Sequence, residues 1–170
     1  MKRPPIRFGL LAAFLLAAGA ALLAVVDNER ILDEGRVVLA ELAPVDPRSL
    51  MQGDYMALRY AIDDELAAVS RTEQAPMAPA FAFVALDGEG RARLVGTGDR
   101  LPPDAQQVAM RLRSRDGAPS IGPNAFFFQE GHAAAFEGAR WGEFRVDAGG
   151  KAPLPPLRDA SLQRLGEIRR

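Results

Sequence analysis

The feature that most constrains the fold is an uncharged apolar run at residues 8–26, which reads FGLLAAFLLAAGAALLAVV. A helix rises about 1.5 Å per residue, so a run of this length crosses a bilayer core of about 30 Å. A cleaved signal peptide is the alternative, with Ala18, Gly19 and Ala20 as its small-residue cleavage site. The run exceeds the roughly 7 to 15 apolar residues of a signal peptide. The pattern therefore favours an uncleaved transmembrane anchor.

Charged residues differ on the two sides of this run. Lys2, Arg3 and Arg7 precede it, whereas Asp27 and Glu29 follow it. Because basic residues stay on the cytoplasmic side of a membrane, we expect the bulk of the chain to lie outside the cytoplasm. We divide the chain into a cytoplasmic tip and transmembrane anchor at residues 1–27 and an extracytoplasmic domain at residues 28–170.

Composition narrows the classes of function. Three of the 21 Lys and Arg residues lie at or before Arg7, which leaves 18 against 22 Asp and Glu and a domain charge of about −4. Nucleic acid is then an unsuitable partner, because binding phosphates requires a clustered positive surface. The chain has no cysteine, and its single histidine is His132. A protein-only zinc site would need carboxylates for nearly all its other ligands, so we expect no metal and no cofactor.

The clearest strand pattern lies at residues 55–62, where apolar side chains occupy every second position. One face holds Met56, Leu58, Tyr60 and Ile62. A period of two residues indicates a half-buried β-strand. The acidic residues at 63–65 are expected to form its solvated end, followed by one helical turn at residues 66–71.

Further short strands are separated by turn signals. We expect them at residues 36–43, 81–86, 91–96, 107–114, 125–128 and 142–146. The sequence Asp87-Gly88-Glu89-Gly90 between two of them predicts a tight hairpin. Residues 27–34 are expected to extend the anchor helix as a stalk, which Gly35 interrupts. The secondary structure of residues 161–168 is not indicated by the sequence. The predicted fold class is all-β, a mainly antiparallel sandwich or partly open barrel, preceded by one transmembrane helix.

Residues 53–60, which read GDYMALRY, fit the pattern G-D-Y-x-x-L-x-Y without a gap. The chain therefore resembles the GDYXXLXY family of bacterial membrane-anchored proteins. Residues 44–48 and 124–131 are similar to that family's proline-aspartate loop and its aromatic-Glu-Gly segment. The residues that match the family motif are Gly53, Asp54, Tyr55, Leu58 and Tyr60. The resemblance implies a single-pass protein of the bacterial inner membrane that accompanies multi-span membrane proteins, and it implies no reaction.

A binding surface is predicted on the outer face of the signature strand, opposite its core stripe. If arginines from neighbouring strands extend that face, they form a patch that binds carboxylates, phosphates or a partner's backbone. The alternative is an ordinary solvated sheet face with weak ion pairs. The candidate binding residues are Tyr55, Arg59, Arg91, Arg93, Arg111 and Arg113.

Two features of the sequence are compatible with catalysis. Residues 50–54 resemble the segment that follows the nucleophile of type I signal peptidases, which makes a membrane-surface hydrolase the alternative function. The nucleophile position is then Val45, and the candidate base Lys151 lies in an exposed setting. Glu130 follows three phenylalanines and is a possible functional carboxylate with a raised pKa, although a structural role in a turn is favoured. We predict a binding or accessory domain without catalytic residues.

Overall fold

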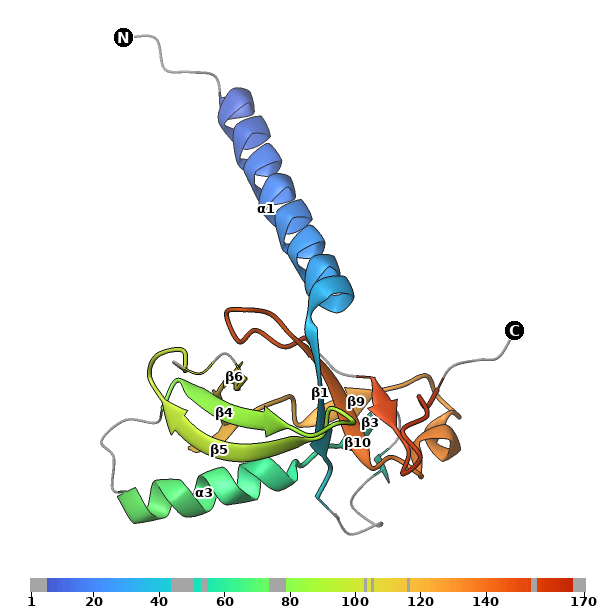
Figure 1. Ribbon diagram of the computed structural model, residues 1–170. Helices are drawn as coiled ribbons and strands as arrows, with labels where there is room; N and C mark the ends of the chain where they lie inside the picture. The colour runs from blue at the N-terminus through green and yellow to red at the C-terminus, as the bar shows by residue number, and fades with distance from the viewer. Residues whose placement is uncertain are drawn as a thin grey trace.

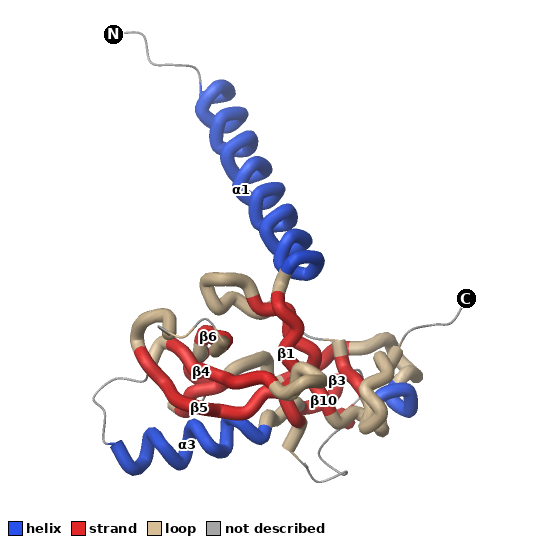
Figure 2. Tube along the Cα trace, viewed as in Figure 1, coloured by secondary structure: helices blue, strands red, loops and turns tan. Residues whose placement is uncertain are grey.

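The computed structural model describes residues 6–43, 51–52, 55–73, 79–102, 104, 106–115, 117–153 and 156–166. A long N-terminal helix stands off a domain built mainly from short antiparallel strands (Figure 1). Figure 2 shows that the part after this helix contains mainly strands joined by loops, with one further long helix, α3 (Ala61–Glu73). No closed barrel forms among the described strands. The predicted fold class, one apolar helix followed by a mainly β domain, is therefore confirmed.

Helix α1 (Ile6–Glu34) contains both the apolar run and the predicted stalk. Over Leu10–Glu34 it is long and apolar enough to cross a membrane by length and composition. The helix ends at Gly35, whose amide donates to the carbonyl of Ile31 at 2.9 Å. A Cβ at Gly35 would clash with that carbonyl and lie 3.1 Å from the backbone of Arg145. Glycine therefore allows β1 to begin immediately after the helix.

Short strands make up most of the domain. They are β1 (Arg36–Glu41), β2 (Met51–Gln52), β3 (Tyr55–Ala57), β4 (Phe81–Leu86), β5 (Ala92–Gly98), β6 (Val108–Arg111), β7 (Arg113–Arg115), β8 (Ala118–Ser120), β9 (Ala125–Phe127), β10 (Trp141–Val146) and β11 (Leu157–Arg158). They form sheets in the orders β1-β10-β11, β2-β3-β9, β5-β4-β6 and β7-β8, and neighbouring strands are antiparallel. The remaining elements are helix α3 (Ala61–Glu73) and the short 3-10 helix η1 (Ala133–Phe136).

The predicted core stripe of the signature strand is confirmed. Met56, Leu58, Tyr60 and Ile62 are all buried. The ring of Tyr60 packs against Phe144 of β10 with a centroid distance of 5.4 Å. The regular strand is shorter than expected, because β3 ends at Ala57. Beyond it, Tyr60 forms an isolated antiparallel bridge with Leu42, just after β1, and the Ala43 amide bonds to the carbonyl of Arg59.

The hairpin predicted at residues 81–96 is also confirmed, with β4 and β5 paired along their length. The Asp87 carboxylate accepts hydrogen bonds from the amides of Glu89 and Arg91, each at 2.9 Å. Gly90 has a φ of 81°, which a residue with a side chain rarely adopts. The bond from the Arg91 amide is the main cause that lowers the pKa of Asp87 below its ordinary value.

One expectation was wrong. Residues 61–73 form the 13-residue helix α3, where a solvated strand end and a single helical turn were predicted. Ile62 and Leu66 are buried one helical turn apart and fix the helix against β8, β1 and β5. Asp63 lies in the first turn, where a helix favours negative charge. Its carboxylate accepts bonds from the Ser120 hydroxyl at 2.7 Å and the Ile121 amide at 3.0 Å.

Two boundaries also differ from the predicted ones. The single strand expected at residues 107–114 is divided into β6 and β7. Strand β6 pairs with β4, and the Leu112 amide continues this register with a bond to the carbonyl of Ala80, whereas β7 pairs with β8. The untyped C-terminal element contains a turn and a bridge between Arg158 and Arg164, with no helix up to Gly166.

Candidate functional site

The signature strand and the aromatic segment are neighbours in space. In the antiparallel pair of β3 and β9, Tyr55 lies opposite Phe127 and Met56 lies opposite Phe126. The Leu58 amide extends the pairing with a 2.8 Å bond to the carbonyl of Asn124. Two segments about 70 residues apart in the chain therefore build one small sheet. Gly53 and Asp54 lie outside the described residues.

The outer face of this sheet exposes aromatic surface. The rings of Tyr55 and Phe127 are 5.8 Å apart, and 71% of Phe127 is exposed. Strand β9 is the last in the order β2-β3-β9, so its outer side pairs with none of the described strands. Phe126 instead packs inward on Phe136 at 5.1 Å. We call the half-buried Tyr55, the exposed Phe127 and the outer side of β9 together the aromatic edge.

The candidate arginines are divided among different parts of the fold. Arg93 on β5 pairs with Ala85 of β4, and Arg111 on β6 pairs with Phe81 of β4. These two arginines thus lie on opposite sides of the same strand. Arg113 belongs to β7, in another sheet. The structure therefore does not bring the five candidate arginines onto one sheet face beside Tyr55, and a binding role for each of the six candidates stays a prediction.

Each of three arginines already has a local partner. Arg59 forms an ion pair with Asp64 at 2.5 Å, and both side chains are exposed. Arg91 forms an ion pair with Glu89 and lies 5.3 Å above the ring centroid of Trp141. Arg111 lies 5.7 Å above the ring centroid of Phe81. Of these three arginines, Arg59 is the nearest to Tyr55 in the chain.

Glu130 lies in an exposed turn. The next residue, Gly131, has a φ of 80°, and the Nδ1 of His132 is 3.3 Å from the carbonyl oxygen of Glu130. Both side chains are exposed. This setting fits the structural role that was favoured for Glu130, and it does not bury the carboxylate against the phenylalanines.

The groups of the hydrolase alternative do not converge in the part of the chain that the structure describes. The Nζ of Lys151 is 2.6 Å from a carboxylate oxygen of Asp27, and both side chains are exposed. Val45 lies outside the described residues. The described residues also contain no group of three or more His, Cys, Asp or Glu that could hold a metal ion.

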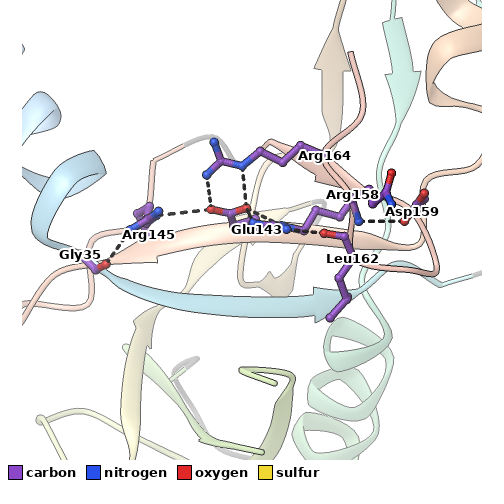
Figure 3. Close-up of polar contacts among 8 residues, drawn as sticks. Gly35, Glu143, Arg145, Arg158, Asp159, Leu162 and Arg164 are labelled. Carbon is purple, nitrogen blue, oxygen red and sulfur yellow. Dashed lines mark hydrogen bonds and ion pairs between the residues drawn. The ribbon is translucent and has the colours of Figure 1, made fainter. Parts of the chain in front are cut away.

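A buried carboxylate was missed at the sequence level. Glu143 of β10 is 0% exposed and contacts three arginines (Figure 3). Arg158 donates to it at 2.5 Å and Arg164 at 2.7 Å, while Arg145 lies at 3.4 Å. Burial raises the pKa of Glu143, but the hydrogen bonds and charges of Arg164 and Arg158 outweigh burial and lower that pKa below its ordinary value.

This cluster holds the C-terminal segment on the domain. Arg158 also donates to the carbonyl of Leu162, and Arg145 reaches the carbonyl of Gly35 at the end of α1. Because arginine carries more donors than one carboxylate can use, the cluster connects several backbone segments at once. The signal in the sequence was the pair Arg158 and Arg164 after the proline-rich stretch, which local patterns do not connect with Glu143.

Comparison with known proteins gives one match. A protein family described as "GDYXXLXY protein" matches residues 17–157, which is most of the chain. The matched region includes the second half of α1 and every strand up to the first residue of β11. No curated protein and no solved structure matches this chain.

Proposed function

We propose, from the premise that the chain belongs to the GDYXXLXY protein family, that it is an extracytoplasmic binding domain anchored in the bacterial inner membrane. In this proposal it serves as an accessory subunit of a multi-span membrane protein. The aromatic edge is the contact surface, and the exposed ring of Phe127 is the single observation that carries the proposal.

An exposed aromatic ring on an open strand favours association. Burying a phenylalanine side chain contributes roughly 1.5 to 3 kcal/mol, and aromatic residues dominate the energetics of protein interfaces. An unpaired strand edge offers a row of backbone donors and acceptors to a partner strand. Phe127 combines both features, since it lies on the edge strand β9, and its ring is in contact with Tyr55 of the central strand β3. A partner that adds a strand to β9 would cover Phe127 at the same time.

The junction of helix and domain supports a partner in the same membrane. Only Gly35 separates α1 from β1, and Lys151 forms an ion pair with Asp27 of the helix. A domain without a linker stays close to the bilayer surface, whereas a long flexible linker would let it reach distant partners. The basic residues that precede the apolar run support an extracytoplasmic domain.

The test is co-purification of the tagged full-length protein from native membranes in mild detergent, followed by mass spectrometry. The variant Phe127→Thr removes the exposed ring and keeps a residue that suits a strand. The matched control is Val95→Thr, which changes an exposed apolar residue of β5. We expect a stoichiometric multi-span partner with the wild type and the control, and its loss with Phe127→Thr. Recovery of the protein alone after crosslinking, or a partner retained by Phe127→Thr, would contradict the proposal.

A further inference from the structure

A cleft of about 780 Å³ opens where α1 meets the domain. One wall is the last two turns of α1, including Asp27, Arg30 and Glu34. The opposite wall comes from the end of β10 and the turn that follows it, at residues 146–149, and from Leu101, Pro102, Asp104, Gln107, Val108 and Ala109. Figure 1 shows the loop after β10 rising toward the end of the helix. The volume falls within the range of roughly 300 to 1,000 Å³ that is typical of small-molecule sites.

The apolar run fixes the level of this cleft relative to a membrane. The run ends at Val26, and the helical wall of the cleft begins at the next residue, Asp27. A bilayer core of about 30 Å is bounded by headgroup layers that bring the total to about 40 to 45 Å. Eight helical residues span roughly 12 Å. When residues 8–26 occupy the core, the cleft therefore opens in the headgroup layer and extends just above it.

The lining carries both signs of charge, with an excess of acidic groups. Its charged residues are Asp27, Arg30, Glu34, Arg36, Asp104 and Asp147. Several are already paired: Arg30 with Glu34 at 2.8 Å, and Asp27 with Lys151 at 2.6 Å. The Asp147 carboxylate accepts from backbone amides of its own turn.

Two groups of the lining retain binding capacity. The guanidinium of Arg36 has no hydrogen bond or ion pair with another described residue. Asp104 bonds through one carboxylate oxygen to the Gln106 amide at 2.8 Å, and its other oxygen has no hydrogen bond or ion pair with another described residue. At the same cleft, Leu101 is 52% exposed. An available cation, an available carboxylate oxygen and an exposed apolar side chain therefore share one cleft.

We infer that this cleft binds the headgroup of a zwitterionic phospholipid with a primary ammonium group, a phosphoethanolamine headgroup. Arg36 binds the phosphate through charge-assisted hydrogen bonds, and Asp104 accepts from the ammonium group. Leu101 contacts the lipid where its acyl chains begin. The acidic excess disfavours a purely anionic headgroup, and a choline headgroup lacks the N–H donors that a carboxylate can accept. The inference rests on the membrane anchoring in the proposed function, but not on the aromatic edge.

The test is native mass spectrometry of the full-length protein after it is released from nanodiscs. The nanodiscs contain equal parts of phosphatidylethanolamine, phosphatidylcholine and phosphatidylglycerol. We expect selective retention of phosphatidylethanolamine. Arg36→Gln should reduce that retention about tenfold, the effect of one lost hydrogen bond between charged groups. Asp104→Asn should reduce the preference over phosphatidylcholine. The matched control is Arg140→Gln, an exposed arginine just before β10 and outside the cleft, and it should bind lipid as the wild type does.

Three results would overturn the inference. Equal retention of phosphatidylglycerol would mean that the cleft is a general anion site. Unchanged retention in Arg36→Gln would place the lipid elsewhere. Displacement of the lipid by an equal concentration of soluble phosphoethanolamine would identify the free compound as the ligand. The proposed function fails separately, because Phe127→Thr should leave lipid retention unchanged. Extraction of the wild type from membranes by alkaline carbonate would contradict the anchoring that both proposals share.

Discussion

The substitution Glu143→Gln tests whether the buried carboxylate holds the C-terminal segment on the domain. Glu143 is fully buried on β10, and Arg158 and Arg164 donate to its two oxygens at 2.5 and 2.7 Å. Glutamine has almost the same shape but no charge. Its amide group also turns N–H donors toward guanidinium groups that can only donate. The change therefore removes the electrostatic attraction and at least one hydrogen bond without leaving a cavity.

The expected loss of stability lies at the lower end of the cost of breaking a buried ion pair, because part of the lost interaction is compensated. Breaking a buried ion pair by neutralising one partner costs about 3 to 5 kcal/mol. Here the arginines keep a route to water, because the side chains of Arg158 and Arg164 are 24% and 38% exposed. Glutamine also keeps one carbonyl oxygen as an acceptor for a charged donor, a bond worth about 1.5 to 3 kcal/mol. We expect the free energy of unfolding to fall by about 3 kcal/mol.

The assay is urea unfolding of the full-length protein in detergent, followed by tryptophan fluorescence. Trp141 is the only tryptophan of the chain, and it lies opposite Arg158 in the sheet that the carboxylate holds together. The matched control is Asp64→Asn, which breaks the exposed ion pair with Arg59 and should cost less than about 1 kcal/mol. The reasoning is refuted if Glu143→Gln costs no more than this control at equal denaturant slopes.

The remaining predictions concern pH and packing. The pKa of Glu143 is lowered in the folded protein from its ordinary value of 4.5, so its contribution to stability is present above pH 4.5 and is lost as pH falls toward the folded pKa. Unfolding at about pH 6 and about pH 3 should therefore show a larger acid destabilisation for the wild type than for Glu143→Gln, and equal losses would contradict the assignment. Gly122→Ala should lower stability by about 1 to 3 kcal/mol, because its Cβ would lie 2.7 Å from the ring of Phe144. Gly88→Ala, where the added Cβ meets nothing within 4 Å, is the control in thermal unfolding. Gly35→Ala should alter the angle between α1 and the domain, because the added Cβ would clash with the Ile31 carbonyl. Since the chain lacks cysteine, spin labels on cysteines placed at Asn28 and Ala148 can measure this change, and identical distance distributions would count against it.

Local sequence patterns predicted the elements whose conformation is determined by residues close to one another in the chain. The hairpin at residues 81–96 follows from a turn that Asp87 and Gly90 build by themselves. The end of α1 follows from Gly35, where no side chain fits. The burial of Met56, Leu58 and Tyr60 follows from alternation, which reports the face of a strand without any knowledge of its neighbours.

Helix α3 could not be predicted in the same way, because Ile62 fits both the two-residue period of a strand and the spacing of a helix. It continues the alternation of Leu58 and Tyr60, and it also begins the helical spacing to Leu66. The choice between them depends on a distant contact. Ser120, 57 residues away from Asp63, donates to its carboxylate at the start of the helix. A contact of this kind leaves no trace in the local pattern.

The candidate binding residues show the same limit of local sequence patterns, because their distances depend on the order of whole strands. Alternation placed Arg93 and Arg111 on strand surfaces, but their distance depends on the order β5-β4-β6, which separates them. Strand order brings Tyr55 and Phe127 together, whereas it separates the two arginines. Each lies in a segment that the sequence singles out, and the order β2-β3-β9 brings their rings into contact. Which side chains meet on a surface of this domain thus depends on strand order, and strand order is set by long-range pairing. For that reason the two residues that most need a joint test are Tyr55 and Phe127, which neither charge nor local spacing would have paired.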